Sequence, residues 1–355
     1  MRRALEHARR GLGRTTPNPV VGACIVTSEG VVVGDGAHER AGGPHAEIHA
    51  LEEAGAASRG ATLYCTLEPC AHTGRTGPCT ERIIAAGVRR VVAAMEDPSP
   101  LVAGRGFAAL RAHGIEVRDG VERAAAVRLN QPFLTTLGKG RPFVILKAAT
   151  SIDGRIADAP GRRTALTSTA ANRRVQYLRA QVDAVAVGSE TILVDDPLLT
   201  VREVYRERPL TRVVFDRRLR TPPQARLLST RSAGPVIILT TAALAATRSA
   251  ERSALERAGA RVVVVEDGSV GRALRALAAC DIQSVLLEGG AAVHAAAWEE
   301  GVVDCVQLYV APRAIGKGGV PLLAGRPWSL SSLTDPHVEI LGPDIVIEGY
   351  VHRPH

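Results

Sequence analysis

The first 120 residues alternate between amphipathic stretches and short apolar runs. Apolar positions at helical spacing predict helices over residues 2–11, 45–54 and 79–86, and a helix followed by a strand over 105–118. Apolar runs bounded by glycine and proline predict strands over 20–27, 31–37, 61–67 and 88–95. Strands that alternate with helices are typical of an α/β domain.

The alternation restarts after "RLNQPFLTTLGKGRP", which we interpret as a connection. The following pattern predicts strands over 143–149, 182–187, 211–215, 235–240, 261–265, 283–288 and 304–310, with helices over 168–180, 243–258 and 290–300. A chain of 355 residues is also too long for one ordinary core. We therefore expect two α/β domains, residues 1–141 (with a linker from about residue 121) and residues 142–355.

Composition and charge narrow the class of protein. The chain is 46% hydrophobic and 23% charged, without an apolar run that could cross a bilayer, so we expect no membrane partner. Its N-terminal segment lacks the apolar core of a secretory signal, so we expect a cytoplasmic protein. The net charge of +8 is spread over both halves without a basic block, which argues against nucleic acid and favours small anionic ligands such as phosphorylated compounds.

The six cysteines are too few for a disulfide framework in a chain of this length. Four of them, Cys24, Cys65, Cys280 and Cys305, lie in apolar runs and are expected to be small buried residues. Cys70 and Cys79 differ, because they flank the polar, glycine-rich loop "CAHTGRTGPC". These two are therefore candidates for chemistry.

The stretch "HAEIH" is a second candidate. Zinc proteases carry a glutamate directly after the first histidine of a similar pattern, whereas Glu47 comes two positions after His45. On a regular helix two such side chains point about 200° apart, so they serve one site only where a helix begins. The preceding "GGP" predicts that beginning at about His45.

His45, Cys70 and Cys79 together form a typical catalytic zinc set, with three protein ligands and one position for water. Cys79 would open a helix, where unpaired N–H groups stabilise a thiolate. Zinc deaminases share the pattern His-x-Glu followed by Pro-Cys and a second cysteine, with the glutamate as proton shuttle, and here Glu47 takes that place. A purely structural zinc site would instead need a fourth ligand.

The eight residues between Cys70 and Cys79, where deaminases usually have two, are the more specific feature. "TLEPCAHTGRTGPC" resembles the deaminase half of the bifunctional deaminase–reductase family of riboflavin biosynthesis. The resemblance continues in "TTPNPVVG", "GPHAEIHAL", "DPSPLVAGRG", "LNQPFL", "LKAATSIDGRIA", "GSETILVDDPLLTVR", "LLEGGAAVHAA" and "APRAIG". It implies a cytidine-deaminase-like α/β/α domain with a mixed sheet, then a dihydrofolate-reductase-like α/β domain, with Zn²⁺ and NADPH as cofactors.

For the first half, the resemblance implies hydrolytic deamination of a 2,5-diamino-6-(phosphoribosylamino)pyrimidinone. Asn18 is then expected to hydrogen-bond the pyrimidine ring, and His72 and Arg75 to contact ring and phosphate. Asn18 could also merely shape a turn, and Arg75 could be solvated. We interpret His38 and His49 as structural.

For the second half, the resemblance implies reduction of the ribosyl group to ribityl by NADPH. Lys147 and Glu288 would then be catalytic beside the sugar carbon, with Glu288 also binding substrate. The other expected substrate contacts are Arg179, Leu199 and Arg202. The expected cofactor contacts are Ala149, Ala165, Thr191, Asp195, Arg217 and Gly290. No G-x-G-x-x-G motif follows a strand, so a Rossmann site is not expected.

Two of these positions depart from the family pattern. Ala165 stands where tryptophan is frequent, and Arg217 stands where a small hydroxyl residue is common. Arg217 could hold the adenosine 2′-phosphate or lie exposed to solvent. The resemblance also implies a homodimer through the second domain. The alternative is a zinc-dependent base or nucleoside deaminase with an unrelated or inactive second half; a deaminase of exposed bases would need stacking aromatics, which make up only 3% of this chain.

Overall fold

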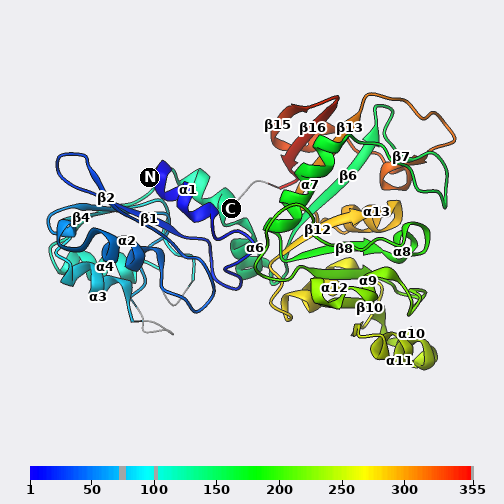
Figure 1. The fold of residues 1–355 in the computed structure, drawn as a ribbon, viewed down its shortest axis with the longest axis horizontal. Helices are drawn as coiled ribbons and strands as arrows, with labels where there is room; N and C mark the ends of the chain where they lie inside the picture. The colour runs from blue at the N-terminus through cyan, green and yellow to red at the C-terminus, as the bar shows by residue number, and fades with distance from the viewer. Residues whose placement is uncertain (72–76, 100–102, 353–355) are drawn as a thin grey trace. The chain divides into compact units, whose positions relative to one another are not determined.

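The computed structural model describes residues 1–71, 77–99 and 103–352 (Figure 1). The described chain divides into two compact units, Met1–Gly138 and a second unit that begins at Lys139. Each unit has its own sheet and its own buried core. None of the helices in the described ranges is long and apolar enough to cross a membrane.

The first unit is built on a mixed sheet with strand order β2-β1-β3-β4-β5. Its strands are β1 (Gly22–Val26), β2 (Val32–Ala37), β3 (Thr62–Cys65), β4 (Arg90–Ala93) and β5 (Glu116–Arg118). Its helices are α1 (Arg2–Arg9), α2 (Ala46–Ala54), α3 (Cys79–Ala85), α4 (Arg105–Ala112), α5 (Arg123–Leu129) and α6 (Gln131–Lys139). β1 runs antiparallel to β2 and β3, whereas β3, β4 and β5 are parallel. The mixed sheet predicted from the resemblance is thus confirmed.

Glycines allow helices to approach this sheet closely on both faces. A Cβ on Gly22 of β1 would stand 2.0 Å from the carbonyl oxygen of Ala4 in α1. On β2, a Cβ on Gly36 would stand 1.9 Å from the carbonyl oxygen of Ala46, at the start of α2. Since Gly22 pairs with Ala37, it faces the opposite side of the sheet from Gly36. The two helices therefore cover opposite faces of the sheet. The missing side chain of Gly36 determines how closely α2 packs on β2.

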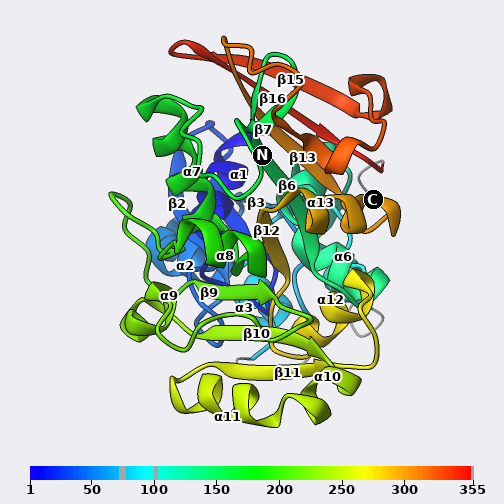
Figure 2. The same cartoon turned by 90° about the vertical axis from the view of Figure 1, so that its right-hand side faces the viewer.

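The second unit is built on a larger sheet with strand order β11-β10-β9-β8-β12-β6-β13-β16-β15. Its strands are β6 (Phe143–Ser151), β8 (Ala184–Gly188), β9 (Thr211–Phe215), β10 (Val236–Thr241), β11 (Arg261–Val265), β12 (Ser284–Gly289), β13 (Cys305–Ala311), β15 (Thr334–Leu341) and β16 (Asp344–Tyr350). From β11 to β13 all neighbours are parallel, and β16 and β15 are antiparallel additions. Figure 2 shows β11 at one edge and β15 at the other.

Helices cover both faces of the parallel part of this sheet. They are α7 (Thr169–Gln181), α8 (Ser189–Asp195), α9 (Arg226–Ser229), α10 (Ala242–Thr247), α11 (Ser249–Arg257), α12 (Val270–Ala278) and α13 (Ala291–Glu299). A small separate pair, β7 (Arg155–Ala157) and β14 (Val320–Pro321), lies beside β6. The parallel α/β arrangement agrees with the predicted dihydrofolate-reductase-like class.

Three local predictions were wrong or incomplete. The stretch interpreted as a connection contains the end of α5 and all of α6, and Asn130 between these helices bonds both backbone groups of Val20, just before β1. The helix predicted over 243–258 is two helices, since Arg248 has non-helical angles of φ −115° and ψ 46°. The hairpin β15–β16 and helix α12 were not predicted.

Candidate active sites

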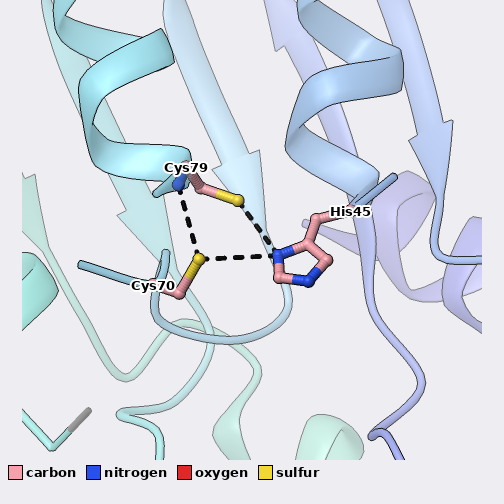
Figure 3. A group of neighbouring side chains, drawn as sticks. All are labelled: His45, Cys70 and Cys79. Atoms are coloured by element: carbon pink, nitrogen blue, oxygen red, sulfur yellow. Dashed lines mark hydrogen bonds between the residues drawn. The ribbon is translucent and has the colours of Figure 1, made fainter. Parts of the chain in front are cut away.

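The first candidate site lies where α2 and α3 begin. His45 is the N-cap of α2, with extended angles of φ −76° and ψ 161°, and Glu47 lies in the first helical turn. This start allows His45 and Glu47 to serve one site, as the "GGP" break predicted. Cys79 is the first residue of α3, and Cys70 follows β3 in the preceding loop. Figure 3 shows the three side chains pointing toward one another.

The donor atoms of this cluster are spaced for a tetrahedral metal. The His45 Nδ1 lies 3.1 Å from the Cys79 sulfur and 3.5 Å from the Cys70 sulfur. Tetrahedral zinc with normal bond lengths would separate nitrogen and sulfur ligands by about 3.6 Å. All three donor atoms lie within 4.8 Å of one another, and in the described chain no other His, Cys, Asp or Glu joins this set. The residues therefore fit Zn²⁺ with three protein ligands, and Glu47 is not among them.

The electrostatics of the cluster suit a cation. A hydrogen bond from the Cys79 thiol lowers the pKa of Cys70 to about 4, helped by His45 and opposed by burial. The Cys79 backbone N–H also donates to the Cys70 sulfur at 3.4 Å, as expected at a helix start. The neighbouring Cys70 sulfur, together with burial, raises the pKa of the Cys79 thiol. The Cys70 thiolate thus forms readily, and a bound divalent ion would favour the thiolate form of both cysteines.

Glu47 is a buried carboxyl group close to this cluster. Its side chain is 3% exposed, and its Oε2 atom has no hydrogen-bond partner in the described structure. Burial raises the pKa of Glu47 to about 7, while His45 lowers it and Cys70 raises it further. A carboxyl group that gains or loses a proton near neutral pH can both accept and return one.

Asn18 is linked to the cluster through His38, which sequence reasoning treated as structural. The His38 Nδ1 lies 3.0 Å from the Pro44 carbonyl oxygen, so this nitrogen carries the proton and donates. The Nε2 of His38 must then accept, and the Asn18 amide nitrogen donates to it at 3.0 Å. The Asn18 side-chain oxygen is therefore the group left to accept a hydrogen bond from a ligand. The His38 ring also packs edge-on against His45, with centroids 5.4 Å apart.

The signal for His38 was its position directly after β2, in the segment that leads to His45. The two other residues expected to bind substrate here, His72 and Arg75, lie outside the described residues. Glu68, three residues from the end of β3, was not predicted either. It is buried and accepts hydrogen bonds from the backbone N–H groups of Asp97, Gly104 and Phe107, which holds Asp97 and the start of α4 in place.

The second candidate site is a pocket of about 850 Å³ in the second unit. It follows the carboxyl ends of six neighbouring strands, β6, β12, β8, β9, β10 and β11. At a spacing of about 4.8 Å, five gaps between strands span about 24 Å, which suits an extended dinucleotide. Open parallel sheets bind ligands at this edge. Of the predicted residues, the pocket wall contains Lys147, Ala149, Thr191, Asp195, Arg217, Glu288 and Gly290.

Lys147 of β6 and Glu288 of β12 lie at one end of this row of strands. Burial lowers the pKa of Lys147; Glu288 opposes this shift and Arg179 adds to it. The Lys147 ammonium lies 5.5 Å from the centre of the buried Tyr309 ring. Glu288 is paired with Arg179 through two contacts, Nε to Oε1 at 2.6 Å and Nη2 to Oε2 at 2.7 Å. Lys147 and Glu288 thus both line the pocket, whereas Arg179, which binds Glu288, does not.

The Gly-Gly turn lies between β12 and α13. A Cβ on Gly289 would stand 2.8 Å from the Thr191 hydroxyl, so this glycine is required by the approach of α8. Gly290 has a φ of 87°, which favours glycine, and caps α13 without a side-chain hydrogen bond. The first N–H groups of this nine-residue helix therefore remain available for an anion.

Arg217 and Asp195 line other parts of the pocket wall. Arg217 follows β9, and its side chain lies over Gly268, where a Cβ would stand 3.0 Å from the Arg217 Cδ atom. Asp195 has a raised pKa because it is half-buried, with Arg163 opposing the shift, and its Oδ1 atom lacks a partner in the described chain. Arg217 thus lines the pocket, and it is also exposed to solvent.

Besides Arg179, three predicted residues lie outside the pocket wall. Leu199 is 3% exposed and packs in the core. Arg202 is exposed, and its backbone N–H donates to Gln176 at 2.9 Å. Ala165 is exposed, although its neighbour Thr164 lines the pocket. The structure therefore groups Lys147 and Glu288 with the cofactor positions but does not bring Leu199, Arg202 or Ala165 into the same cavity.

His294 is a pocket residue that sequence reasoning did not single out, although it lies in the "LLEGGAAVHAA" motif. Its side chain is 1% exposed, and its Nε2 lies 3.1 Å from the Leu287 carbonyl oxygen. Nε2 therefore donates, and Nδ1 has no partner in the described structure. Burial lowers the pKa of His294 to about 4, so the ring is neutral at physiological pH.

Both units match known protein families. Residues 142–347 match the model of the RibD C-terminal domain, and residues 1–95 match the zinc-binding region of cytidine and deoxycytidylate deaminases. Riboflavin biosynthesis protein RibD of Aquifex aeolicus is 40% identical over 98% of this chain and 96% of its own length. The chain belongs to the RibD family.

Other RibD proteins are similarly close over their whole length. RibD of Escherichia coli is 38% identical, covering 98% of this chain and 97% of its own. The structure of Acinetobacter baumannii RibD matches with a TM-score of 0.86 at 36% identity, over 99% of this chain and 98% of its own. A Thermotoga maritima structure described as a diaminohydroxyphosphoribosylaminopyrimidine deaminase/5-amino-6-(5-phosphoribosylamino)uracil reductase has a TM-score of 0.85 at 35% identity, covering 99% and 97%. The RibD match confirms the predicted family and both predicted fold classes.

Proposed function

We propose that this RibD-family protein catalyses two consecutive steps of riboflavin biosynthesis. The first is hydrolytic deamination of 2,5-diamino-6-(5-phosphoribosylamino)pyrimidin-4(3H)-one. The second is NADPH-dependent reduction of the ribosyl group of 5-amino-6-(5-phosphoribosylamino)uracil to ribityl. The observation that carries this function is the donor set of His45, Cys70 and Cys79 with the buried Glu47 beside it. We assign the first step to residues 1–141 and the second to residues 142–355.

In the first step, Zn²⁺ held by His45, Cys70 and Cys79 would supply a Lewis acid that lowers the pKa of a water molecule. Glu47 accepts a proton from that water, whose oxygen bonds to the amino-bearing ring carbon. Glu47 then returns the proton to the departing nitrogen, the carbon–nitrogen bond breaks and ammonia leaves. The Asn18 oxygen accepts a hydrogen bond from the ring, and His72 and Arg75 contact ring and phosphate.

In the second step, NADPH supplies the hydride for the sugar carbon when it is bound in the pocket. We assign Ala149 and Ala165 to the nicotinamide end, Thr191, Asp195 and Gly290 to the middle, and Arg217 to the 2′-phosphate. Lys147 donates the proton that completes the reduction of the open-chain imine, and burial lowers its pKa toward a useful value. Arg202 binds the substrate phosphate, Leu199 supports its side of the site, and Glu288 contacts the sugar.

We further propose a homodimer through the second unit. β15 pairs only with β16 in the described sheet, so its outer edge is open. Val338 and Ile340 on this strand are 60% and 79% exposed, and Ile345 on β16 is 40% exposed. An open edge with apolar side chains favours pairing with a second copy of the chain. A cytoplasmic location fits two thiol ligands that must stay reduced.

The test is to assay the zinc-loaded protein in two reactions. We expect ammonia release from the diaminopyrimidinone substrate, and NADPH oxidation on the deaminated phosphoribosylaminouracil. Ammonia release without NADPH oxidation would support a deaminase with an inactive second half. Neither reaction in a protein that holds one zinc per chain would refute the proposal.

A further inference from the structure

Lys147 is a partly buried lysine on β6 that lines the pocket of the second unit. Its ammonium lies over the Tyr309 ring, 5.5 Å from the ring centre. Within the described part of the chain, this ammonium has no hydrogen bond and no ion pair. An ammonium group within about 6 Å of an aromatic centre is attracted by the negative face of the ring. The Tyr309 ring is therefore the direct partner of this charge in the folded unit.

Strand pairing brings Tyr309 to Lys147. β6 and β13 are parallel neighbours, with Lys147 opposite Gln307 and Ala149 opposite Tyr309. Successive side chains of a strand point to opposite faces, so these four residues share one face of the sheet. On that face Tyr309 packs in a small apolar cluster with Val175 of α7, and it is fully buried. The tyrosine is thus held between the sheet and α7, beside the lysine.

The Tyr309 ring is also held at its hydroxyl end. The hydroxyl donates to Gln307 Oε1 at 2.8 Å, and Gln307 Nε2 donates to the Glu348 Oε2 of β16 at 2.5 Å. Because a carboxylate oxygen accepts, the amide nitrogen faces Glu348 and the amide oxygen is left for the tyrosine. Burial raises the pKa of Tyr309, so its hydroxyl stays protonated and remains a donor. Packing and these two hydrogen bonds together fix where the ring face lies.

We propose that Tyr309 is a positioning residue of the reductase site, whose ring face holds the Lys147 ammonium at the wall of the pocket. Tyr309 is not among the described residues that line the pocket, so it acts through Lys147. This role rests on the proposed reduction, in which Lys147 donates a proton. A leucine fills a similar space but has no negative face, so the ammonium would lose its direct partner.

The ring also favours the charged form of Lys147. Burial lowers the pKa of Lys147, while Glu288 of β12 opposes this shift and Arg179 of α7 adds to it. His294 of α13 is neutral, because burial lowers its pKa to about 4. An aromatic face attracts an ammonium ion more strongly than a neutral amine, so Tyr309 acts with Glu288 against burial. Without the ring, Lys147 should lose its proton at a lower pH.

The first test follows Lys147 directly and does not depend on reductase activity. The chain has lysine only at Lys139, Lys147 and Lys317, so protein made with isotope-labelled lysine gives few side-chain NMR signals. In the wild type, the ring should displace the Lys147 ε-methylene signal. Tyr309→Leu should remove this displacement and lower the titration midpoint by about one pH unit. Tyr309→Phe, which keeps the ring, should behave as the wild type does.

The Lys139 and Lys317 signals are the internal reference and should be the same in all three proteins. Lys147→Arg identifies the Lys147 signal by its disappearance. An unchanged Lys147 midpoint in Tyr309→Leu would overturn the proposal, because the ring would then have no effect on the charge.

The second test measures catalysis. In Tyr309→Leu, kcat for NADPH oxidation should fall about 10–100-fold, as for a misplaced catalytic group, with the substrate KM within about threefold. The basic limb of the kcat/KM profile should move to lower pH, since Lys147 acts in its charged form. Tyr309→Phe should stay within about threefold of the wild type, without a shift of this limb. A higher KM with unchanged kcat would instead place Tyr309 in substrate binding and contradict the positioning role.

Val346→Ala separates the loss of packing from the loss of the ring. Val346 of β16 pairs with Tyr309 and lies in the same apolar cluster, so this variant loses packing but keeps the ring. It should match the wild type in kcat and in the Lys147 midpoint. Equal losses of kcat in Val346→Ala and Tyr309→Leu, with no change in either midpoint, would show a merely structural role. NADPH binding and ammonia release, measured on each protein, confirm that both units are folded.

Pentafluorophenylalanine at position 309 covers the case in which Tyr309→Leu does not fold. It has nearly the shape of phenylalanine, but its fluorine atoms withdraw electrons and remove the negative charge from the ring face. We expect a lower kcat and a lower Lys147 midpoint than in Tyr309→Phe. Identical behaviour of the two ring variants would disprove the role. If the wild type itself does not oxidise NADPH, the proposed function fails, whereas the NMR titration still decides whether the ring holds Lys147.

Discussion

Gly36 lies directly beneath the Ala46 carbonyl group, so that a Cβ on Gly36 would stand 1.9 Å from the carbonyl oxygen. Ala46 lies between His45, a proposed zinc ligand, and Glu47, so this contact sets the position of both side chains relative to β2. Because Gly36 has no side chain, the first turn of α2 can pack directly against β2. The consequence can be tested directly.

Gly36→Ala should shift the start of α2 and separate His45 from the two cysteines. We expect a loss of about 1–3 kcal/mol in the free energy of unfolding, the usual cost of overpacking, and reduced zinc content. Thermal unfolding and metal analysis of the purified protein would measure both. Gly138→Ala is the matched control, because a Cβ there meets nothing within 4 Å. Full zinc content in Gly36→Ala would contradict this account.

Glu47→Gln should retain zinc but lose ammonia release by about 10²–10⁴-fold, the usual contribution of a proton-transfer group. The amide has nearly the same shape but cannot carry the proton. Zinc content is measured alongside activity, and Cys70→Ser, which removes a ligand, should lose both. Normal ammonia release in Glu47→Gln would show that another group moves the proton.

Arg202→Ala should weaken reduction and leave deamination intact, since Arg202 belongs to the second unit. We expect mainly a higher KM for the phosphorylated substrate, because a charged hydrogen bond to phosphate is lost. Steady-state NADPH oxidation and ammonia release, measured on the same preparation, check this. Arg257→Ala, an exposed arginine on α11, should change neither rate. Equal losses in both reactions would disprove the assignment.

His294 should make the second unit less stable in acid. Its pKa is about 4 in the folded chain and about 6.5 when unfolded, so the unfolded chain binds the extra proton first. The stability from the neutral ring is complete above about pH 6.5 and is lost as the pH falls toward 4. Between pH 7 and pH 5 this amounts to about 2 kcal/mol.

Denaturant unfolding of the wild type and His294→Gln at both pH values measures this effect. The difference in stability between the two proteins should shrink by that amount at pH 5. His113→Gln, at an exposed position on the first unit, is the control and should follow the wild type at both pH values. A difference that does not change with pH would mean that His294 is not held neutral by burial.

Ile340→Lys should dissociate the proposed homodimer. A lysine on the open edge of β15 places a charge opposite its copy in any edge-to-edge pairing. Sedimentation velocity should report a monomer, with both catalytic rates retained if neither site spans the interface. Val31→Lys, at a position 56% exposed in the first unit, should leave the dimer unchanged. If the wild type itself sediments as a monomer, the proposed homodimer is refuted.

Much of the first site could be predicted from sequence because its signals are local. "GGP" before His45 predicts where a helix starts, and Pro78 before Cys79 marks another start. Helix starts supply N–H groups and outward-pointing side chains, so a histidine and a cysteine there are recognisable as ligands without coordinates. The apolar runs likewise predicted the parallel strands of the second unit, since strands buried on both faces are continuously hydrophobic.

The sequence could not show which distant side chains become partners. Arg179 and Glu288 are 109 residues apart, and Asn18 and His38 are 20 apart, so neither pair follows from helix or strand spacing. The β15–β16 hairpin was missed because its exposed strand mixes polar residues with Pro336 and carries no clear alternation.

The sequence alone thus determined the secondary structure that carries the ligands, the metal they suit and the family. Local propensity and side-chain chemistry are written residue by residue, which is why those properties could be read without coordinates. Only the tertiary structure decided that Arg179 binds Glu288 and that the Lys147 ammonium lies over the Tyr309 ring. Which groups meet depends on packing between α7, β6, β12 and β13, and that packing is a property of the whole folded unit.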